Sequence, residues 1–175
     1  MAQQLTDAIR AYIGMETGVL TAGEPVERGA VRRFAQAVMD PDPAYADAAH
    51  TGATRYGAPV APPMFPVTML HPALGAPDLI AEHASEPDFD GLIEASAMGL
   101  PPLPLVNSPQ LNAGAAFEML RLARQGETIR VQSRYRDIFE REISRGRALF
   151  VVIETDFTDA DGALICRFSK TLIRS

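Results

Sequence analysis

The sequence predicts an α+β fold in which a long antiparallel β-sheet wraps around a central apolar helix. Three observations predict this class. An amphipathic helix pattern precedes residue 40, an almost wholly apolar helical segment begins near residue 62, and four strand-like stretches fill residues 113–174. A buried helix followed by a sheet with one apolar face must pack against that face, which is the arrangement of an α+β domain.

The first predicted element is a short amphipathic helix at residues 4–13. Its apolar residues, Leu5, Ile9, Tyr12 and Ile13, fall on one helical face. We expect residues 14–23 to be irregular and residues 24–27 to enter a short strand.

The clearest helix is predicted at residues 29–39. Val31, Phe34, Ala35 and Val38 recur at the spacing of one helical face. Pro41 and Pro43 then end the helix, so the segment from Asp40 to Tyr45 is expected to be a tight loop.

A second helix is expected to begin near Pro62 and Pro63, because proline is well placed in a first helical turn. Residues 64–70 are apolar nearly all round, which is typical of a buried helix. Residues 71–110 contain seven prolines and predict a long irregular overhang. Its apolar residues either shape an acyl pocket or form a surface excursion; they are Leu100, Leu103, Leu105 and Val106.

The last third of the chain is expected to be an antiparallel meander of four strands, at 113–121, 127–141, 147–158 and 163–174. Alternation predicts three sets of core-facing residues: Ile129, Val131, Tyr135 and Phe139; then Leu149, Val151, Ile153 and Phe157; then Leu164, Cys166, Phe168 and Leu172. The segment from Asp159 to Gly162 predicts a hairpin turn.

Composition limits the classes of function. A chain of 175 residues with 47% hydrophobic content suits one domain spanning residues 1–175. A net charge of -6 argues against nucleic-acid binding. The N-terminus does not resemble a signal peptide, and no apolar run is long enough to span a membrane. Because Cys166 is the only cysteine and cannot form an internal disulfide, we expect a cytoplasmic protein.

General catalytic motifs are absent. The sequence has no nucleophile elbow, zinc-protease motif, paired C-x-x-C or phosphate-binding glycine loop. The three histidines, His50, His71 and His83, have no second ligand at a metal-binding spacing, so we expect no metal site. Cys166 alternates with apolar residues and is expected to be a small core residue.

The segment from Phe34 to Tyr45 resembles the loop of the MaoC-like (R)-specific enoyl-thioester hydratases and 3-hydroxyacyl-thioester dehydratases. Those proteins carry Gly-Asp-x-Asn-Pro-x-His after a Phe-Ala helix. In this sequence the corresponding residues are Met39, Asp40, Asp42, Pro43 and Tyr45. In the family, the aspartate and histidine hold and activate the water that adds to the double bond.

Two further segments support the resemblance. Residues 57–64, with Ala61-Pro62-Pro63, look like the start of the family's central helix, where Ala-His-Gly is usual. Residues 111–174 look like the family's C-terminal strands. The most similar subgroup is the MaoC N-terminal, or type-I-fatty-acid-synthase-like, dehydratase domains, which include the non-catalytic halves of mycobacterial-type heterodimeric dehydratases. The resemblance implies a hot-dog fold, an acyl-thioester substrate carried on coenzyme A or an acyl-carrier protein, no cofactor, and a second hot-dog domain as partner.

Two departures from the family pattern fall on the chemistry. Tyr45 is a poor general base in place of histidine, because the reference pKa of tyrosine is about 10. Pro63 replaces the glycine whose backbone N–H would bind the thioester carbonyl, and loss of one such donor typically costs about 2.7–4 kcal/mol. The candidate catalytic residues are therefore Asp40 and Tyr45. The alternatives are that Asp40 and Asp42 only turn the chain and that Tyr45 is a packed aromatic.

Candidate substrate-binding residues are Pro62, Pro63 and Met64, with Arg134 and Arg136 from a run of eight arginines between residues 121 and 147. Arginine favours bidentate contacts with phosphate, so these side chains could hold a carrier phosphate. The alternative is a solvated sheet face or ion pairs with a partner subunit.

The sequence is consistent with three functions. The first is a substrate-binding, non-catalytic subunit of a hydratase or dehydratase, paired with a catalytic MaoC-like subunit in a heterodimer or heterotetramer. The second is a self-sufficient homodimeric hydratase or thioesterase, with Asp40 and Tyr45 as a modified catalytic pair. The third is a non-enzymatic acyl-CoA-binding protein.

Overall fold

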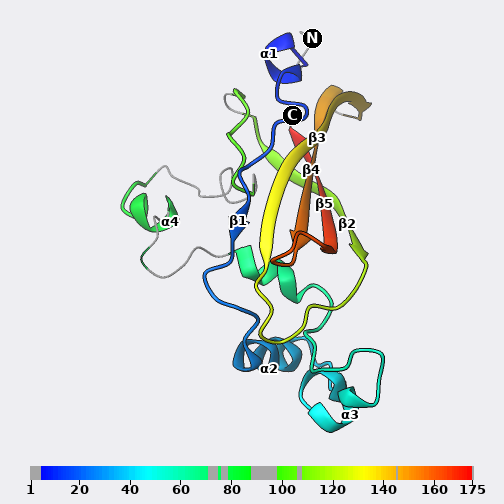
Figure 1. Cartoon of the computed structure of the whole chain (residues 1–175). Coiled ribbons are helices and arrows are strands. Elements are labelled where there is room, and N and C mark those ends of the chain that lie inside the picture. The colour runs from blue at the N-terminus through cyan, green and yellow to red at the C-terminus, as the bar shows by residue number, and fades with distance from the viewer. Residues whose placement is uncertain are drawn as a thin grey trace.

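The computed structural model of the chain describes residues 5–70, 75, 79–87, 98–105, 108–144 and 146–174. Five strands form one sheet: β1 (Leu20–Thr21), β2 (Gln110–Met119), β3 (Arg130–Ile143), β4 (Gly146–Thr158) and β5 (Leu164–Arg174). The α-helices are α1 (Asp7–Arg10), α2 (Arg28–Ala37), α3 (Ala48–Gly52) and α4 (Leu79–Glu82), with 3-10 helices at Pro43–Tyr45 and Phe65–Leu70. α2 and α3 lie at one end of the sheet and α1 at the opposite end (Figure 1).

The strand order is β1-β3-β4-β5-β2, with all pairs antiparallel. The prediction of a four-strand meander is therefore wrong for β2, which pairs with β5 and not with β3. The reason is the segment between β2 and β3. It crosses the end of the sheet and bonds to the chain before the second 3-10 helix, where the Ala61 N–H donates to the Ala123 carbonyl at 2.7 Å. β3 therefore lies on the opposite side of the sheet from β2, next to the edge strand β1.

A bulge in β3 changes which of its residues face the core. The pairing with β4 shifts between Tyr135 and Asp137, so Ile138 is buried on the side of Tyr135. The prediction that Phe139 shares that face is wrong. Phe139 lies opposite Phe150 and stacks on it with 5.3 Å between ring centroids. The predicted face of β4 and the Asp159–Gly162 turn are confirmed, with Phe157 buried and the Asp159 N–H bonded to the Ala163 carbonyl at 3.0 Å. In β5, Cys166 and Leu172 are buried as predicted, but the prediction for Leu164 is wrong: the pairing with β4 shifts between Phe157 and Thr158, and Ile165 is buried in its place.

The core consists of two clusters along the sheet. One cluster joins α2 and the Phe65–Leu70 segment to the end of the sheet near them, and includes Val31, Phe65 and Phe157. The other cluster joins the N-terminal segment to the middle of the sheet, and includes Ile9, Leu100, Tyr135 and Ile138. The predicted helix at 29–39 is confirmed as α2. The helix predicted at 4–13 is shorter, although Leu5 and Ile9 are buried as expected.

The central apolar element is a 3-10 helix where an α-helix was predicted. Phe65 and Pro66 are buried, and Val67, Met69 and Leu70 pack against the same cluster. Phe65 and Val67 donate to carbonyls three residues earlier. Pro62, Pro63 and Pro66 have no N–H to donate, which removes the bonds that would nucleate an α-helical turn.

The strand predicted at residues 24–27 is wrong, and the first strand is β1. The backbone of Val26 is taken up by the turn before β3 and not by the sheet. Its N–H donates to the Glu127 carbonyl at 2.9 Å, and its carbonyl accepts the Gly126 N–H at 2.8 Å. Gly126 has a φ of 83°, which suits glycine in this turn.

The overhang at 71–110 is only partly within the described residues, and Val106 lies outside them. Leu100 is buried in the second cluster, and Leu103 and Leu105 pack against it. These leucines therefore fill the core, and none of them lines a described hollow. Among the residues described, no helix is both long and apolar enough to cross a membrane.

Candidate functional site

The end of α2 places Asp40. Met39 takes the left-handed conformation with a φ of 57°, and the chain reverses there. The Asp40 N–H donates to the Ala35 carbonyl at 3.0 Å and the Met39 N–H donates to the Gln36 carbonyl at 3.2 Å, which is the pattern of a Schellman cap. Glycine is the usual residue at this position of a cap. The left-handed backbone conformation at position 39 therefore accounts for the glycine that the family pattern has there.

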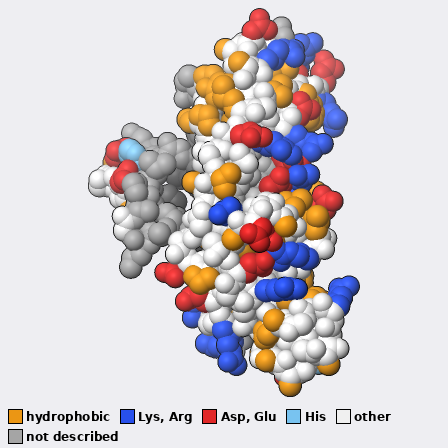
Figure 2. All heavy atoms as spheres, viewed as in Figure 1, with side chains coloured by type: hydrophobic (Ala, Val, Ile, Leu, Met, Phe, Trp, Pro, Cys, Tyr) orange, Lys and Arg blue, Asp and Glu red, His pale blue; other side chains and the backbone are white. Residues whose placement is uncertain are grey.

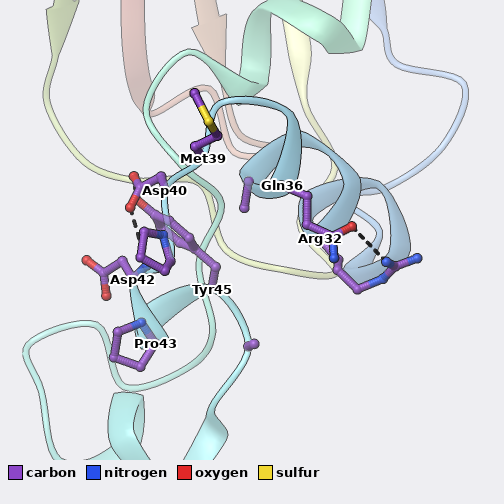
Figure 3. A pocket seen from close by; sticks show the side chains of 10 residues that line it. Arg32, Gln36, Met39, Asp40, Asp42, Pro43 and Tyr45 are labelled. Atoms are coloured by element: carbon purple, nitrogen blue, oxygen red, sulfur yellow. Dashed lines mark hydrogen bonds between the residues drawn. The ribbon is translucent and has the colours of Figure 1, made fainter.

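Asp40 and Tyr45 are in direct contact. The Tyr45 hydroxyl donates to Oδ2 of Asp40 at 2.8 Å (Figure 3). The Asp42 N–H donates to Oδ1 of Asp40 at 3.3 Å. Asp42 in turn caps the 3-10 helix Pro43–Tyr45, since its Oδ1 accepts the Ala44 N–H at 2.8 Å. Pro43 occupies the first turn of that helix. Asp40 thus closes the loop, and Asp42 turns the chain into Tyr45.

Tyr45 is a hydroxyl donor and not a base. Burial raises the pKa of its hydroxyl above the ordinary value of 10.0, and the hydrogen bond to Asp40 and the nearby charges of Asp40 and Asp42 raise it further. The hydroxyl is therefore protonated throughout the physiological range. It can donate a hydrogen bond to a carboxylate or to a substrate oxygen.

A residue that the sequence did not single out fixes the backbone of Tyr45. Nε2 of Gln125 donates to the Tyr45 carbonyl at 2.7 Å, and the Val60 N–H donates to the Ala44 carbonyl at 3.1 Å. Gln125 is 80 residues away in sequence. No local motif marks it, because its role depends on the crossing of the segment between β2 and β3.

Two hollows flank the loop. The first has a volume of about 350 Å³ and is lined mainly by apolar residues of α2 and the loop, with Asp40, Asp42 and Tyr45 on its wall. In Figure 3 the side chain of Met39 points away from the Asp40–Tyr45 pair. The second hollow, of about 660 Å³, includes Tyr45, Pro63 and three arginines in its lining. Asp42 and Tyr45 line both hollows, so the loop forms a wall between them.

The structure brings Pro63 to the same hollow as Tyr45. Pro62 is buried, whereas Met64 is 38% exposed and has a φ of 67°. Pro63 has no N–H, so it offers no hydrogen bond to a carbonyl bound in that hollow. The two departures from the family pattern thus lie in one site.

Arg134 and Arg136 line neither hollow. Both form ion pairs with Glu154 of β4, whose side chain is only 2% exposed; Nη1 of Arg136 lies 2.6 Å from its Oε2. Nε of Arg167 lies 3.4 Å from Oε1 of the same carboxylate. A buried carboxylate requires such counter-charges. On the face of the molecule seen in Figure 2, basic and acidic side chains are interspersed.

The described residues contain no group of three or more His, Cys, Asp or Glu side chains that could hold a metal ion. Cys166 is buried, and burial raises the pKa of its thiol to about 12, so the thiol is unreactive at neutral pH. His83 bonds to Glu86 at 2.8 Å, His50 is exposed, and His71 lies outside the described residues.

The sequence matches the family described as FAS1-like, dehydratase domain region, over residues 11–168. No curated protein sequence matches it. Several solved structures share its fold. The crystal structure of the ChsH1–ChsH2 complex from Mycobacterium tuberculosis aligns with a TM-score of 0.70 at 15% identity, over 96% of this chain and 89% of that one.

The (R)-hydratase from A. caviae involved in PHA biosynthesis aligns with a TM-score of 0.57 at 16% identity, over 98% of both chains. The C-terminally truncated HadBC (3R-hydroxyacyl-ACP dehydratase) complex from Mycobacterium tuberculosis aligns with a TM-score of 0.57 at 20% identity, over 92% of this chain and 96% of that one. The predicted α+β hot-dog fold is confirmed by these alignments.

Proposed function

This chain belongs to the family of FAS1-like dehydratase domain regions, and from that premise we propose that it is the substrate-binding, non-catalytic subunit of an (R)-specific enoyl-thioester hydratase or 3-hydroxyacyl-thioester dehydratase. The observation that carries the proposal is the hydrogen bond from the Tyr45 hydroxyl to Asp40.

With tyrosine at position 45, the loop lacks the imidazole that the family pattern supplies as a base. Addition of water to an enoyl thioester requires a group that takes a proton from the water. Tyr45 is protonated and donates, and each oxygen of Asp40 already accepts one hydrogen bond within the loop. Pro63 offers no N–H to the developing enolate oxygen. The hollows flanking the loop remain, so the site keeps room for a substrate without the groups that transform it.

The catalytic groups would come from a MaoC-like partner subunit in a heterodimer or heterotetramer. Two of the structures with this fold are complexes, ChsH1–ChsH2 and HadBC. β2 is an edge strand of ten residues, most of them exposed, and an unpaired edge of that length is suited to pairing with a second chain. The substrate would be an acyl thioester of coenzyme A or a carrier protein, with no further cofactor, and the location would be the cytoplasm.

The test is an assay of the purified chain with crotonyl-CoA, following loss of the conjugated thioester absorbance. We expect no turnover by the chain alone and turnover when a catalytic MaoC-like subunit is added. Robust turnover by the chain alone that disappears in Asp40→Asn would overturn the proposal.

A second candidate is a self-sufficient homodimeric hydratase or thioesterase. It is favoured by the position of the Asp40–Tyr45 pair on the wall of an apolar hollow. The same assay separates the two, with release of free thiol reporting a thioesterase. Calorimetric binding of crotonyl-CoA without turnover, even beside a catalytic subunit, would instead indicate an acyl-CoA-binding protein.

A further inference from the structure

We propose that the second hollow, beside Pro63, is a phosphate-binding subsite in which Arg55 and Arg124 hold the phosphate of the substrate's phosphopantetheine carrier. This proposal rests on the proposed function, because it assumes an acyl thioester as the ligand. No sequence motif assigns a role to Arg55, and Arg124 is marked only as one of a run of eight arginines.

The fold brings the two arginines to one hollow from distant segments. Arg55 follows α3, and Arg124 lies in the segment between β2 and β3. An isolated β-bridge between Val60 and Arg124 joins these segments. The guanidinium of Arg55 lies 5.1 Å from the centroid of the Tyr56 ring, and its Nη2 donates to the Tyr56 hydroxyl at 3.2 Å. Both arginines are exposed, so a ligand can reach them.

The charges of the hollow favour an anion at these two residues. Arg121 also lines the hollow, but its guanidinium is engaged by Glu127 at 2.6 Å and Asp159 at 2.8 Å. Among the residues that the structure describes, neither Arg55 nor Arg124 has an ion pair. Asp42 is the one acidic residue in the lining, and its carboxylate caps the Ala44 N–H. Arg55 and Arg124 are therefore two cations without carboxylate partners.

Both hollows adjoin the Asp40–Tyr45 loop. The apolar hollow lies on one side of the loop and the arginine-lined hollow on the other, and Tyr45 lines both. In the proposed arrangement the acyl chain lies in the first hollow, and the carrier passes Tyr45 to reach the second. Guanidinium groups bind phosphate by paired N–H donors, and each such charge-assisted bond contributes appreciable affinity.

The test compares three ligands that differ in phosphate: crotonyl-CoA, crotonyl-4′-phosphopantetheine and crotonyl-pantetheine. Affinities of the full chain for each are measured by titration calorimetry. We expect Arg55→Ala and Arg124→Ala each to weaken crotonyl-CoA binding by about tenfold or more, and to leave crotonyl-pantetheine binding unchanged. The lysine variants keep the charge but lose the paired donors, so their affinity for crotonyl-CoA should lie between those of the wild type and the alanine variants. Arg147→Ala, in the β3–β4 hairpin at the opposite end of the sheet, is the matched control.

The outcomes separate the subsite from the function. If both variants also weaken crotonyl-4′-phosphopantetheine, the arginines contact the phosphate shared by coenzyme A and carrier proteins. If they weaken crotonyl-CoA binding alone, the arginines contact the nucleotide phosphates, and their assignment to the phosphopantetheine phosphate is overturned. Unchanged crotonyl-CoA affinity in both variants, or wild-type binding of crotonyl-pantetheine as tight as that of crotonyl-CoA, overturns the subsite and leaves the proposed function standing. Wild-type binding of none of the three ligands overturns both.

Discussion

Tyr45 donates its hydroxyl hydrogen to Oδ2 of Asp40 across 2.8 Å, five residues along the chain. In the resembled family this position holds the histidine that activates water. Here it holds Tyr45, whose hydroxyl donates a hydrogen bond to the aspartate. The carboxylate of Asp40 is present, but its partner in the loop is a hydroxyl donor and not an imidazole.

Restoring the two missing groups should create activity. In Tyr45→His with Pro63→Gly, an imidazole with a reference pKa of about 6.5 can accept a proton, and the glycine supplies a backbone N–H. We expect the double variant to turn over crotonyl-CoA, and each single variant to be about 10²-fold or more slower. Adding Asp40→Asn to the double variant should abolish the gain. A folded double variant that binds crotonyl-CoA and shows no turnover would mean that the geometry of the site, and not only its groups, has been lost.

Met39→Gly should raise the free energy of unfolding. A residue other than glycine in the left-handed conformation costs about 1–2 kcal/mol, partly offset by the greater freedom of glycine in the unfolded chain. Met39 is 87% exposed, so little packing is lost, and we expect a net gain of about 0.5–1 kcal/mol in denaturant melts. Met39→Ala keeps the penalty and is the control. Equal stability of the two variants would show that the backbone at this cap is not strained.

Glu154→Gln should destabilise the sheet. The variant keeps the size of the side chain but removes the negative charge shared by Arg134, Arg136 and Arg167. Because these arginines are partly exposed and regain water, we expect a loss of about 1–3 kcal/mol, below the range for a fully buried pair. Arg136→Ala should cost less than about 1 kcal/mol, since its side chain is 58% exposed.

The same series tests the substrate role predicted for Arg134 and Arg136. Weaker crotonyl-CoA binding by Arg136→Ala, without loss of stability, would support that role. Weaker folding alone would indicate that these arginines only neutralise Glu154.

Stability should fall in alkaline solution. Burial raises the pKa of the Cys166 thiol from 9.0 to about 12 and that of the Tyr135 hydroxyl from 10.0 to about 12. The unfolded chain loses these protons first, so the contribution of each group is complete below its unfolded pKa and is lost as the pH rises towards 12. Each group lowers the free energy of unfolding by up to about 1.4 kcal/mol per pH unit within its window. When the free energy of unfolding is measured by urea melts between pH 8 and pH 10, it should fall less steeply with pH in Cys166→Ala than in the wild type. An identical dependence on pH would contradict the assignment.

The sequence predicted elements whose pattern is local. The spacing of Val31, Phe34 and Val38 and the prolines after them defined α2 and its end, because helical periodicity and the missing proline N–H act within a few residues. Strand alternation failed where a bulge intervened, since one extra residue at Tyr135–Asp137 reverses the face of every residue after it. No pattern in the sequence marks that insertion.

By itself, the sequence determined the class of the fold, the apolar segments of its core, the Asp40–Tyr45 loop and the two positions that depart from the family pattern. The tertiary structure decided that β2 joins β5, that Tyr45 and Pro63 share one hollow, and that Gln125 and Arg124 reach the loop from distant segments. It also placed Arg134 and Arg136 against Glu154 and away from both hollows. What the sequence determined and what the structure decided differ in their distance along the chain. Periodicity and proline act along the chain, whereas contacts between segments depend on the crossing that carries residues 120–129 over the end of the sheet.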